Sequence, residues 1–377
     1  MKQLIRSLLG SGLLPNTYYG AIRYPRMAKS ISHKNDSSLP KVTVVMPVYN
    51  VAEYLLDALA SVLSQSYKNF EVIAVNDGST DGSEKILEML AAEISHLTVI
   101  NQKNLGVAEA RNRGIASMSS DSKYLMFIDS DDLMPKRAIA KLVAAAENSD
   151  AQLTAGKTVT FYGVRYFDRP STASFFAADR AGIKLEQMPE LLGDAVVWNK
   201  LFRADYWRAQ GFKFPKGVNY EDMTLAAESY LNADRITLVS DPVYFWRVRA
   251  EGESRSTLRF EQASLEDRLL SMEQIANRIK AKIRAGEIST AVLESYQQRI
   301  IRHDLQLFVP YLEHVDATYF STLKVRCKAL VGKVSPEQFE AAGGRYNEVL
   351  RMVMSSTRAE AIRTLQKLEK AENRLTA

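Results

Sequence analysis

Short apolar runs alternate with amphipathic stretches through the first half of the chain. Buried strands are expected over residues 42–46, 70–76, 97–101 and 123–128, and helices over 52–64, 83–94 and from about 107. The helix at 52–64 carries its apolar side chains near one face, as expected for packing on a sheet: Tyr54, Leu55, Leu59 and Val62. Strands that alternate with helices in this way favour a parallel sheet built from right-handed βαβ units.

The pattern changes from about residue 259, where apolar residues follow the spacing of helices. One such stripe consists of Leu265, Leu269, Met272, Ala276, Ile279 and Ile283. Proline and glycine residues punctuate the segments, and no heptad pattern persists for three or four repeats. We therefore expect a compact helical domain over residues 259–377. Three roles for it remain open: binding a polymer, holding subunits together as a homo-oligomer, or covering the domain that precedes it.

Polar residues recur where the predicted strands end. Tyr49 and Asn50 follow the first strand, Asp77 ends the second, and Asp129 and Asp131 follow the fourth. Because open α/β sheets bind ligands at the carboxyl ends of their strands, these residues are candidates for a nucleotide pocket. The alternative is that each is a turn former, since Asp and Asn favour turns.

The segment Asp129-Ser130-Asp131-Asp132 places three carboxylates within four residues. Like charges this close repel, and burying one unpaired costs on the order of several kcal/mol or forces it to take a proton. A positive partner is therefore expected, and the usual candidate is a hard divalent cation that bridges to a phosphate. The alternative is an Asp-rich turn that caps the following helix.

A second acidic pair, Glu221-Asp222, follows a predicted loop and opens an apolar-striped helix. Negative charge in the first turn of a helix is stabilised by the helix dipole, so the pair could be an ordinary N-terminal feature. It could also supply a catalytic carboxylate.

Six segments occur in an order that resembles a known family: PVYN at 47–50, NDGSTDGS at 76–83, NLGVAEARNRG at 104–114, DSDD at 129–132, WNKLF at 198–202 and NYEDM at 219–223. Each segment is weak alone, but the ordered set is similar to the motifs of family-2 glycosyltransferases. The resemblance covers roughly residues 41–250 and implies the GT-A nucleotide-diphospho-sugar transferase fold, a mostly parallel α/β sheet flanked by helices. Within the family, the pattern most resembles bacterial enzymes that glycosylate wall teichoic acid or build capsular and other surface polysaccharides.

The resemblance implies roles for residues at the strand ends. Pro47 and Tyr49 would flank the uracil of a UDP-sugar, with Asp77 and Asn104 hydrogen-bonding its edge. Arg111 would lie near the phosphates, where a guanidinium fork suits paired oxygens. Two alternatives stay open: Tyr49 as an aromatic that packs on the sheet, and Arg111 as a helix-surface residue paired with a nearby acid.

The same resemblance implies a metal site and a base. Asp131 would be the direct ligand of Mn²⁺ or Mg²⁺, and Asp129 would face the ribose or the metal. Asp222 would take the proton of the acceptor hydroxyl in an inverting displacement, with Glu221 placing the acceptor or the base. Trp198 would form one wall of the sugar pocket, unless it is simply a core residue.

A basic, hydroxyl-rich loop often closes the diphosphate in this family. Arg247, Arg249 and Ser256 occupy the matching part of this chain and are candidates for that role. The alternative is a solvated charged loop.

The composition is ordinary for a soluble globular protein with two domains: 377 residues, 46% of them hydrophobic and 25% charged. No apolar run is long enough to span a membrane, and no signal-peptide core occurs at the N-terminus. The single cysteine, Cys327, excludes an internal disulfide and a cysteine-based zinc site, and the four histidines are scattered. We therefore expect the protein in the cytoplasm, where nucleotide-sugar donors are expected.

The net charge is concentrated at the N-terminus. Residues 1–40 carry six basic residues and one acid, and so hold the whole formal charge of +5. A basic arm over residues 1–35 that also contains leucines can lie peripherally on an anionic membrane, at ~1 kcal/mol per basic residue near the surface. It could equally dock on the protein or be disordered. Nucleic-acid binding is not expected, because no such motif accompanies the charge.

These observations predict an inverting, metal-dependent glycosyltransferase with a GT-A domain at 36–258. It would move a hexosyl or N-acetylhexosaminyl group from a UDP-sugar to a hydroxyl of a surface glycopolymer or a lipid-linked glycan. Two other classes remain open. One is a nucleotidyltransferase, which also uses an Asp-rich metal site but usually has a Gly-rich phosphate loop that is missing here. The other is a catalytically silent relative that binds polymer and serves assembly.

Overall fold

The structure is a computed structural model that describes residues 36–249 and 259–376, with side chains up to Glu372. The predicted arm at 1–35 and Ser256 lie outside the described residues. The described chain forms two compact units. The first contains residues 36–184, 196–217 and 232–249, and the second contains residues 185–195, 218–231 and 259–376.

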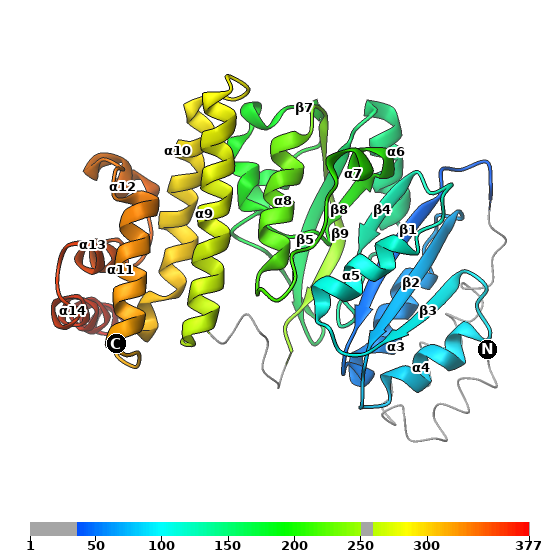
Figure 1. Cartoon of the computed structure of the whole chain (residues 1–377), viewed down its shortest axis with the longest axis horizontal. Helices are drawn as coiled ribbons and strands as arrows, with labels where there is room; N and C mark the ends of the chain where they lie inside the picture. The colour runs from blue at the N-terminus through cyan, green and yellow to red at the C-terminus, as the bar shows by residue number, and fades with distance from the viewer. Residues whose placement is uncertain (1–35, 250–258, 377) are drawn as a thin grey trace. The chain divides into compact units, whose positions relative to one another are not determined.

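The first unit is built on a sheet of nine strands, counted over the described residues (Figure 1). The strands are β1 (Val42–Val48), β2 (Phe70–Asp77), β3 (Leu97–Gln102), β4 (Tyr124–Phe127), β5 (Leu153–Tyr162), β6 (Arg165–Asp168), β7 (Arg180–Ile183), β8 (Lys200–Arg203) and β9 (Ile236–Arg247). Their order is β3-β2-β1-β4-β8-β5-β9-β7, with β6 paired to β5 beside this path. The pairs among β1 to β4 are parallel, which confirms the predicted mostly parallel α/β sheet.

Helices connect the parallel strands. They are α3 (Ala52–Leu63), α4 (Ser83–Ala91), α5 (Val107–Ala116) and α6 (Ala138–Ser149), and the short α7 (Ala204–Gln210) follows β8. All seven residues of β1 are buried, as its apolar sequence predicts. Gly114 lets α5 approach β1 closely, because a Cβ atom there would lie 2.4 Å from Cγ1 of Val45. The apolar faces and strands thus form one large buried cluster and a smaller one of Ile73, Val75 and Ala110, the last of which lies on α5.

The second half of the sheet is mixed. Strand β8 is antiparallel to both β4 and β5, and β9 is parallel to β5. Two antiparallel steps restore the original direction, so the carboxyl ends of β1, β2, β4, β5 and β9 lie at the same edge of the sheet. We call it the carboxyl edge.

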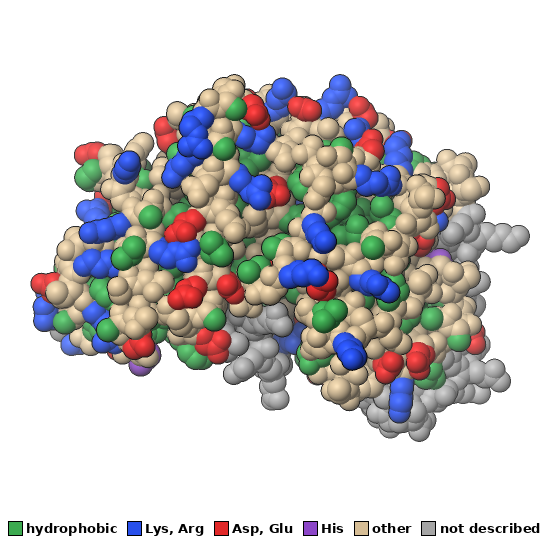
Figure 2. Space-filling view, in the orientation of Figure 1, with side chains coloured by type: hydrophobic (Ala, Val, Ile, Leu, Met, Phe, Trp, Pro, Cys, Tyr) green, Lys and Arg blue, Asp and Glu red, His purple; other side chains and the backbone are tan. Residues whose placement is uncertain are grey.

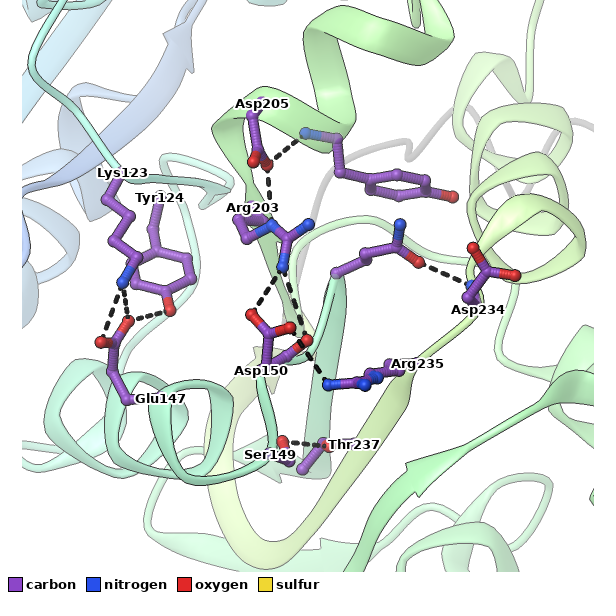
Figure 3. A network of polar contacts seen from close by, with 12 residues as sticks. Lys123, Tyr124, Glu147, Ser149, Asp150, Arg203, Asp205, Asp234, Arg235 and Thr237 are labelled. Carbon is purple, nitrogen blue, oxygen red and sulfur yellow. Dashed lines mark hydrogen bonds and ion pairs between the residues drawn. The ribbon is translucent and has the colours of Figure 1, made fainter.

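Ion pairs occupy the opposite edge of the sheet, the amino edge (Figure 3). Asp150 precedes β5 and accepts hydrogen bonds from Arg203 at 2.9 Å and from Arg235 at 3.1 Å. Arg203 also donates to Asp205 at 2.7 Å. The Asp150 and Asp205 side chains are 70% and 69% exposed, so solvent screens these pairs.

The second unit consists mainly of helices. They are α8 (Glu221–Asn232, whose last residue falls in the first unit), α9 (Gln262–Arg284), α10 (Thr290–Arg299), α11 (Ala317–Val331), α12 (Pro336–Ala342), α13 (Asn347–Ser355) and α14 (Arg358–Thr376). The predicted stripe on α9 is buried except for its last member, Ile283, which is half-buried. A helical region therefore follows the sheet, as predicted. Among the described residues, none of the helices combines the length and the apolar character that crossing a membrane requires.

A buried ion cluster ties helices of the second unit together. Asp304 is 1% exposed and pairs with Arg268 at 2.6 Å and Arg299 at 3.0 Å. Burial opposes ionisation of this carboxyl, but the charges of Arg299 and Arg268 outweigh it, so the pKa of Asp304 is lowered. The buried charge is therefore matched locally, and Asp304 is a structural residue of this unit.

On the face drawn in Figure 2, basic and acidic side chains are interspersed, without a large area of one sign. This agrees with a sequence that carries equal numbers of basic and acidic residues beyond residue 40.

Candidate functional site at the carboxyl edge of the sheet

The turn after β1 is locked to the turn after β2. Asn50 adopts a left-handed conformation with φ of 48°. Its side-chain oxygen accepts from the Thr80 amide at 2.8 Å, and its own amide donates to Ser79 Oγ at 3.1 Å. Pro47 lies in β1 beyond the last residue that pairs with β4, so its missing amide hydrogen costs no ladder bond there. Tyr49 is 47% exposed beside this turn, so its ring can be reached by a ligand.

Asp77, at the end of β2, is buried and holds a neighbouring loop. One carboxylate oxygen accepts from Gln102 Nε2 and from the Leu105 amide, both at 2.8 Å. The other accepts from the Gly106 amide at 2.8 Å. These bonds fix the loop that carries the exposed Asn104. Asp77 therefore has a positioning role that the sequence did not predict, and its predicted contact with a base stays a prediction.

Arg111 is buried on α5 and reaches the DSDD segment. Its Nη2 donates to Asp129 Oδ1 at 2.8 Å, and its side chain is 4% exposed. The guanidinium lies over the ring of Phe214, 5.1 Å from its centre. The alternative of a helix-surface residue is therefore wrong, although the partner is an acid as that alternative required. Glu109 pairs instead with Lys216 at 2.8 Å.

Asp131 is paired with Arg249, which lies two residues beyond the end of β9. Arg249 donates from Nε at 2.9 Å and from Nη2 at 2.6 Å, both to Asp131 Oδ2. Arg247 donates from Nε to the Asp131 backbone carbonyl at 2.6 Å. The two basic residues predicted to close a diphosphate therefore meet the predicted metal ligand. Arg247 is further held between the rings of Tyr54 and Phe161, at 5.1 and 4.7 Å from their centres.

Asp132 is the buried member of the tetrad, at 1% exposure. Its carboxylate accepts from the Tyr244 hydroxyl and from the Arg247 amide, both at 2.7 Å. Burial raises the pKa of Asp132 well above its ordinary value, and the nearby charges of Asp131 and Asp129 add to this. Tyr244 also accepts from the Asp129 amide at 3.1 Å, so one buried hydroxyl braces the whole turn.

Trp198 is 5% exposed and belongs to the core cluster around the sheet. Its ring stacks on Tyr244 with centres 4.1 Å apart. It therefore supports the residue that braces the DSDD turn. Its predicted place as a wall of the sugar pocket is not tested by this packing.

Glu221 and Asp222 begin α8 and belong to the second unit. The loop before them is held within that unit, because Asn219 donates to Asp267 from its amide at 2.9 Å and from its side chain at 2.8 Å. Glu221 is buried and Asp222 is half-buried. The predicted role of this pair as base and placing residue stays a prediction.

The described residues contain no cluster of three or more His, Cys, Asp or Glu side chains able to hold a metal. This excludes an all-protein cage from the part of the chain that is described. Mg²⁺, however, is commonly held by one or two carboxylates together with substrate phosphates. Asp131 and Asp129 fit that second kind of site, with hard oxygen ligands at the end of a strand.

Comparison with known proteins identifies the class. Residues 43–210 match the family model described as "Glycosyl transferase family 2". This part of the chain belongs to glycosyltransferase family 2, and the fold is GT-A.

Three curated relatives are bacterial. The glycosyltransferase GlyA of Streptococcus pneumoniae serotype 4 is 31% identical over 57% of this chain and 32% of its own length. GlyG of the same strain is 27% identical over 70% of this chain and 90% of its own length. The poly(ribitol-phosphate) beta-N-acetylglucosaminyltransferase TarS of Staphylococcus aureus strain MW2 is 28% identical over 58% and 37%. The chain thus spans about a third of GlyA and of TarS, and most of GlyG.

Solved structures agree on the fold. Residues 1–349 of S. aureus TarS, in complex with UDP-GlcNAc, superpose with a TM-score of 0.65 at 21% identity, over 89% of this chain and 92% of that one. At this identity the likeness shows the fold alone.

Proposed function

We propose that the protein is an inverting glycosyltransferase that moves a sugar from a UDP-sugar donor to a hydroxyl of a bacterial surface glycopolymer. The observation that carries this proposal is the set of residues at the carboxyl edge: exposed Tyr49, the loop held by Asp77, and the carboxylate and arginine pairs of the DSDD turn. Ligands of open α/β sheets bind at this edge. The donor class is supported by the likeness to a structure that holds UDP-GlcNAc.

In the proposed site, Pro47 and Tyr49 flank the uracil, and Asp77 and Asn104 form hydrogen bonds with its edge. Asp131, with Asp129, would hold Mn²⁺ or Mg²⁺. When bound, such a cation would supply positive charge to the departing diphosphate. Arg111 pairs with Asp129, and its fork of donors suits paired phosphate oxygens.

Arg247, Arg249 and Ser256 would close over the diphosphate. Arg249 donates two hydrogen bonds to Asp131, so it would exchange this carboxylate for phosphate oxygens when the donor binds. Trp198 would form one wall of the sugar pocket. The protein thereby supplies the charge that stabilises UDP as a leaving group.

Asp222 would act as the general base. The acceptor oxygen forms a bond to the anomeric carbon, the bond from that carbon to the phosphate oxygen breaks, and the hydroxyl proton passes to the Asp222 carboxylate. Attack opposite the leaving group inverts the anomeric centre. Glu221, its neighbour, would place the acceptor or the base.

The acceptor class is supported by the names of the relatives, one of which acts on poly(ribitol phosphate). The transferred sugar would be a hexosyl or N-acetylhexosaminyl group. A basic N-terminal arm would hold the cytoplasmic enzyme on the inner face of the membrane, where a lipid-linked acceptor waits. Removing residues 1–34 should abolish sedimentation with anionic vesicles and leave activity on a soluble acceptor unchanged. Equal sedimentation of both proteins would contradict the tether.

The proposal is tested with UDP-, GDP-, CDP- and dTDP-sugars in the presence of Mn²⁺. A UDP-sugar should raise the melting temperature and release UDP, because ligands that bind the native state stabilise it. Asp222→Asn keeps the shape but cannot accept a proton, so turnover should fall by ~10²–10⁴ while donor affinity stays near that of the wild type. Absence of turnover with every donor would favour a silent polymer-binding relative, and transfer of a nucleotidyl group would favour a nucleotidyltransferase.

A further inference from the structure

Exposed large hydrophobic side chains are concentrated in one part of the first unit. Eleven such side chains occur among the described residues, and six of them lie on β6, in the turn before it, or beside the ends of β5 and β9: Tyr162, Val164, Tyr166, Phe167, Trp246 and Val248. Single exposed apolar residues are ordinary, but a gathered set marks an interaction site.

The strand register shows that four of these side chains share one face of the sheet. Phe167 pairs with Thr160, and Thr160 pairs with Trp246, so these residues form a row across β6, β5 and β9. Side chains two residues apart on a strand point to the same side. Tyr162 and its partner Arg165 therefore form a second row on that face.

Val248 extends the second row. The pairing of Phe161 with Arg247 is followed by a bond from the Val248 amide to the Phe161 carbonyl at 2.9 Å, which sets Val248 beside Tyr162. Phe167 and Trp246, with Tyr162, Val248 and Arg165, are called the aromatic face below.

The aromatic face adjoins the buried residues that brace the DSDD turn of the candidate donor site. Tyr244 lies two residues before Trp246 on the same side of β9, and its hydroxyl donates to Asp132 at 2.7 Å. Arg169 bridges the two regions, because its guanidinium lies 5.3 Å from the ring centre of Trp246 and 5.9 Å from that of Trp198. Successive rows are ~6.6 Å apart along the strands. An extended chain that runs along this face from Trp198, the proposed wall of the sugar pocket, would therefore cross Trp246 first and Tyr162 next.

The chemistry of this face suits a carbohydrate that carries phosphates. Sugar and polyol units present C–H groups that pack on aromatic rings, while a guanidinium binds phosphate oxygens in pairs. Trp246 and Phe167 are 36% and 50% exposed and offer such rings, and Arg165 is an exposed cation in the neighbouring row. We propose that the aromatic face binds the anionic acceptor polymer next to the donor site. This inference rests on the proposed function, which sets the direction in which the polymer runs across the face.

The main test replaces the two rings of the first row. In Trp246→Ala/Phe167→Ala, the Kd for poly(ribitol phosphate) or poly(glycerol phosphate) and the KM for the polymer should rise ~10-fold or more. Release of UDP from a UDP-sugar without acceptor should not change, because no donor-binding residue is altered. Trp246→Phe keeps an aromatic ring, so its Kd and KM for the polymer should lie between those of the wild type and the double variant.

Phe260→Ala is the matched control, since Phe260 has the same side chain as Phe167 and the same exposure of 50% in the second unit. It should leave polymer binding unchanged. Arg165→Gln should weaken binding and reduce its dependence on salt, while Arg180→Gln, an exposed arginine of β7, should do neither. Neutral dextran should bind more weakly than either phosphate polymer.

The inference is overturned if the double variant binds the polymers as the wild type does, or if a wild type that releases UDP binds neither polymer. It is also overturned if the double variant only dissociates a dimer, because β6 would then be an edge for a second copy. The protein could also bind polymer in a way that depends on Trp246 and yet release no UDP from any donor. That result would support polymer binding by the aromatic face and contradict the proposed function.

Discussion

The two edges of the sheet carry the same chemical pair in different surroundings. At the amino edge, Asp150 pairs with Arg203, and the carboxylate is 70% exposed. At the carboxyl edge, Asp131 pairs with Arg249, and the two side chains are 21% and 30% exposed. Ion pairs of the first kind contribute little to stability, because water screens them.

The carboxyl edge differs most in how its charges are grouped. Asp129, Asp131 and the buried Asp132 lie within one turn, and the hydrogen bonds that the Asp132 carboxylate accepts within the described part of the chain come from neutral donors. Burial and then the neighbouring carboxylates raise the pKa of Asp132. Proteins accept such crowding where a ligand is bound, so the grouping of these carboxylates supports our proposal that the donor binds at the carboxyl edge. The comparison teaches that the grouping and burial of charges distinguish a site, and the mere presence of Asp–Arg pairs does not.

The largest difference between the edges should appear in activity. Asp131→Ala removes a charge that the proposed diphosphate site needs, so transfer should fall by ~10²–10³. The melting temperature should stay near that of the wild type, because removing this carboxylate reduces the repulsion within the DSDD segment. Asp150→Ala is the matched change at the amino edge and should leave turnover intact. Similar activity in the two variants would show that the DSDD segment is only a turn.

Arg111→Lys tests the buried pair. A lysine has no planar fork and cannot reproduce the bond to Asp129 over Phe214. Losing a hydrogen bond to a charged group should lower the free energy of unfolding by ~1.5–3 kcal/mol, measured by urea denaturation. Arg203→Lys at the exposed edge is the control, and an equal loss there would remove the distinction between the edges.

Arg249→Gln should affect metal and nucleotide in opposite directions. Without the competing guanidinium, Asp131 should bind Mn²⁺ ~3–5-fold more tightly, since a partly exposed pair contributes at most ~1 kcal/mol. Affinity for UDP should fall. Free Mn²⁺ measured by electron paramagnetic resonance gives the first quantity and calorimetry the second. Unchanged Mn²⁺ binding would show that Arg249 does not compete for this carboxylate.

The smallest effect is expected at the amino edge. Asp150→Asn should change the free energy of unfolding by less than ~1 kcal/mol, and the change should shrink further in high salt. Urea denaturation at low and high ionic strength measures it. A loss of several kcal/mol would mean that the network in Figure 3 is a main support of the fold.

The sequence predicted those parts of the site that are contiguous in the chain. The strand at 42–46 is observed as β1 over Val42–Val48, and the residues of the DSDD segment follow β4 as expected. Apolar runs and turn residues are local signals, so they can be read without knowing the fold. The apolar stripe on α9 was also predicted from such a local signal, the helical spacing of its apolar residues.

Long-range partners could not be predicted. Tyr244 lies in an apolar run, and nothing near it in sequence indicates a bond to Asp132, 112 residues away. The hydrogen bonds by which the Asp77 carboxylate holds the loop of residues 105–106 could not be predicted either, while its expected contact with a base stays a prediction. The hairpin of β5 and β6 was not predicted either, because its exposed aromatic residues do not follow the buried pattern of the other strands.

The most direct measurement is calorimetry of UDP binding with and without Mn²⁺, for the wild type and for Asp131→Ala. If the carboxyl edge binds a metal–diphosphate unit, Mn²⁺ should tighten UDP binding to the wild type and have little effect on the variant. The same Mn²⁺ dependence in both proteins, or no binding of UDP to the wild type, would contradict the assignment of this edge as the donor site.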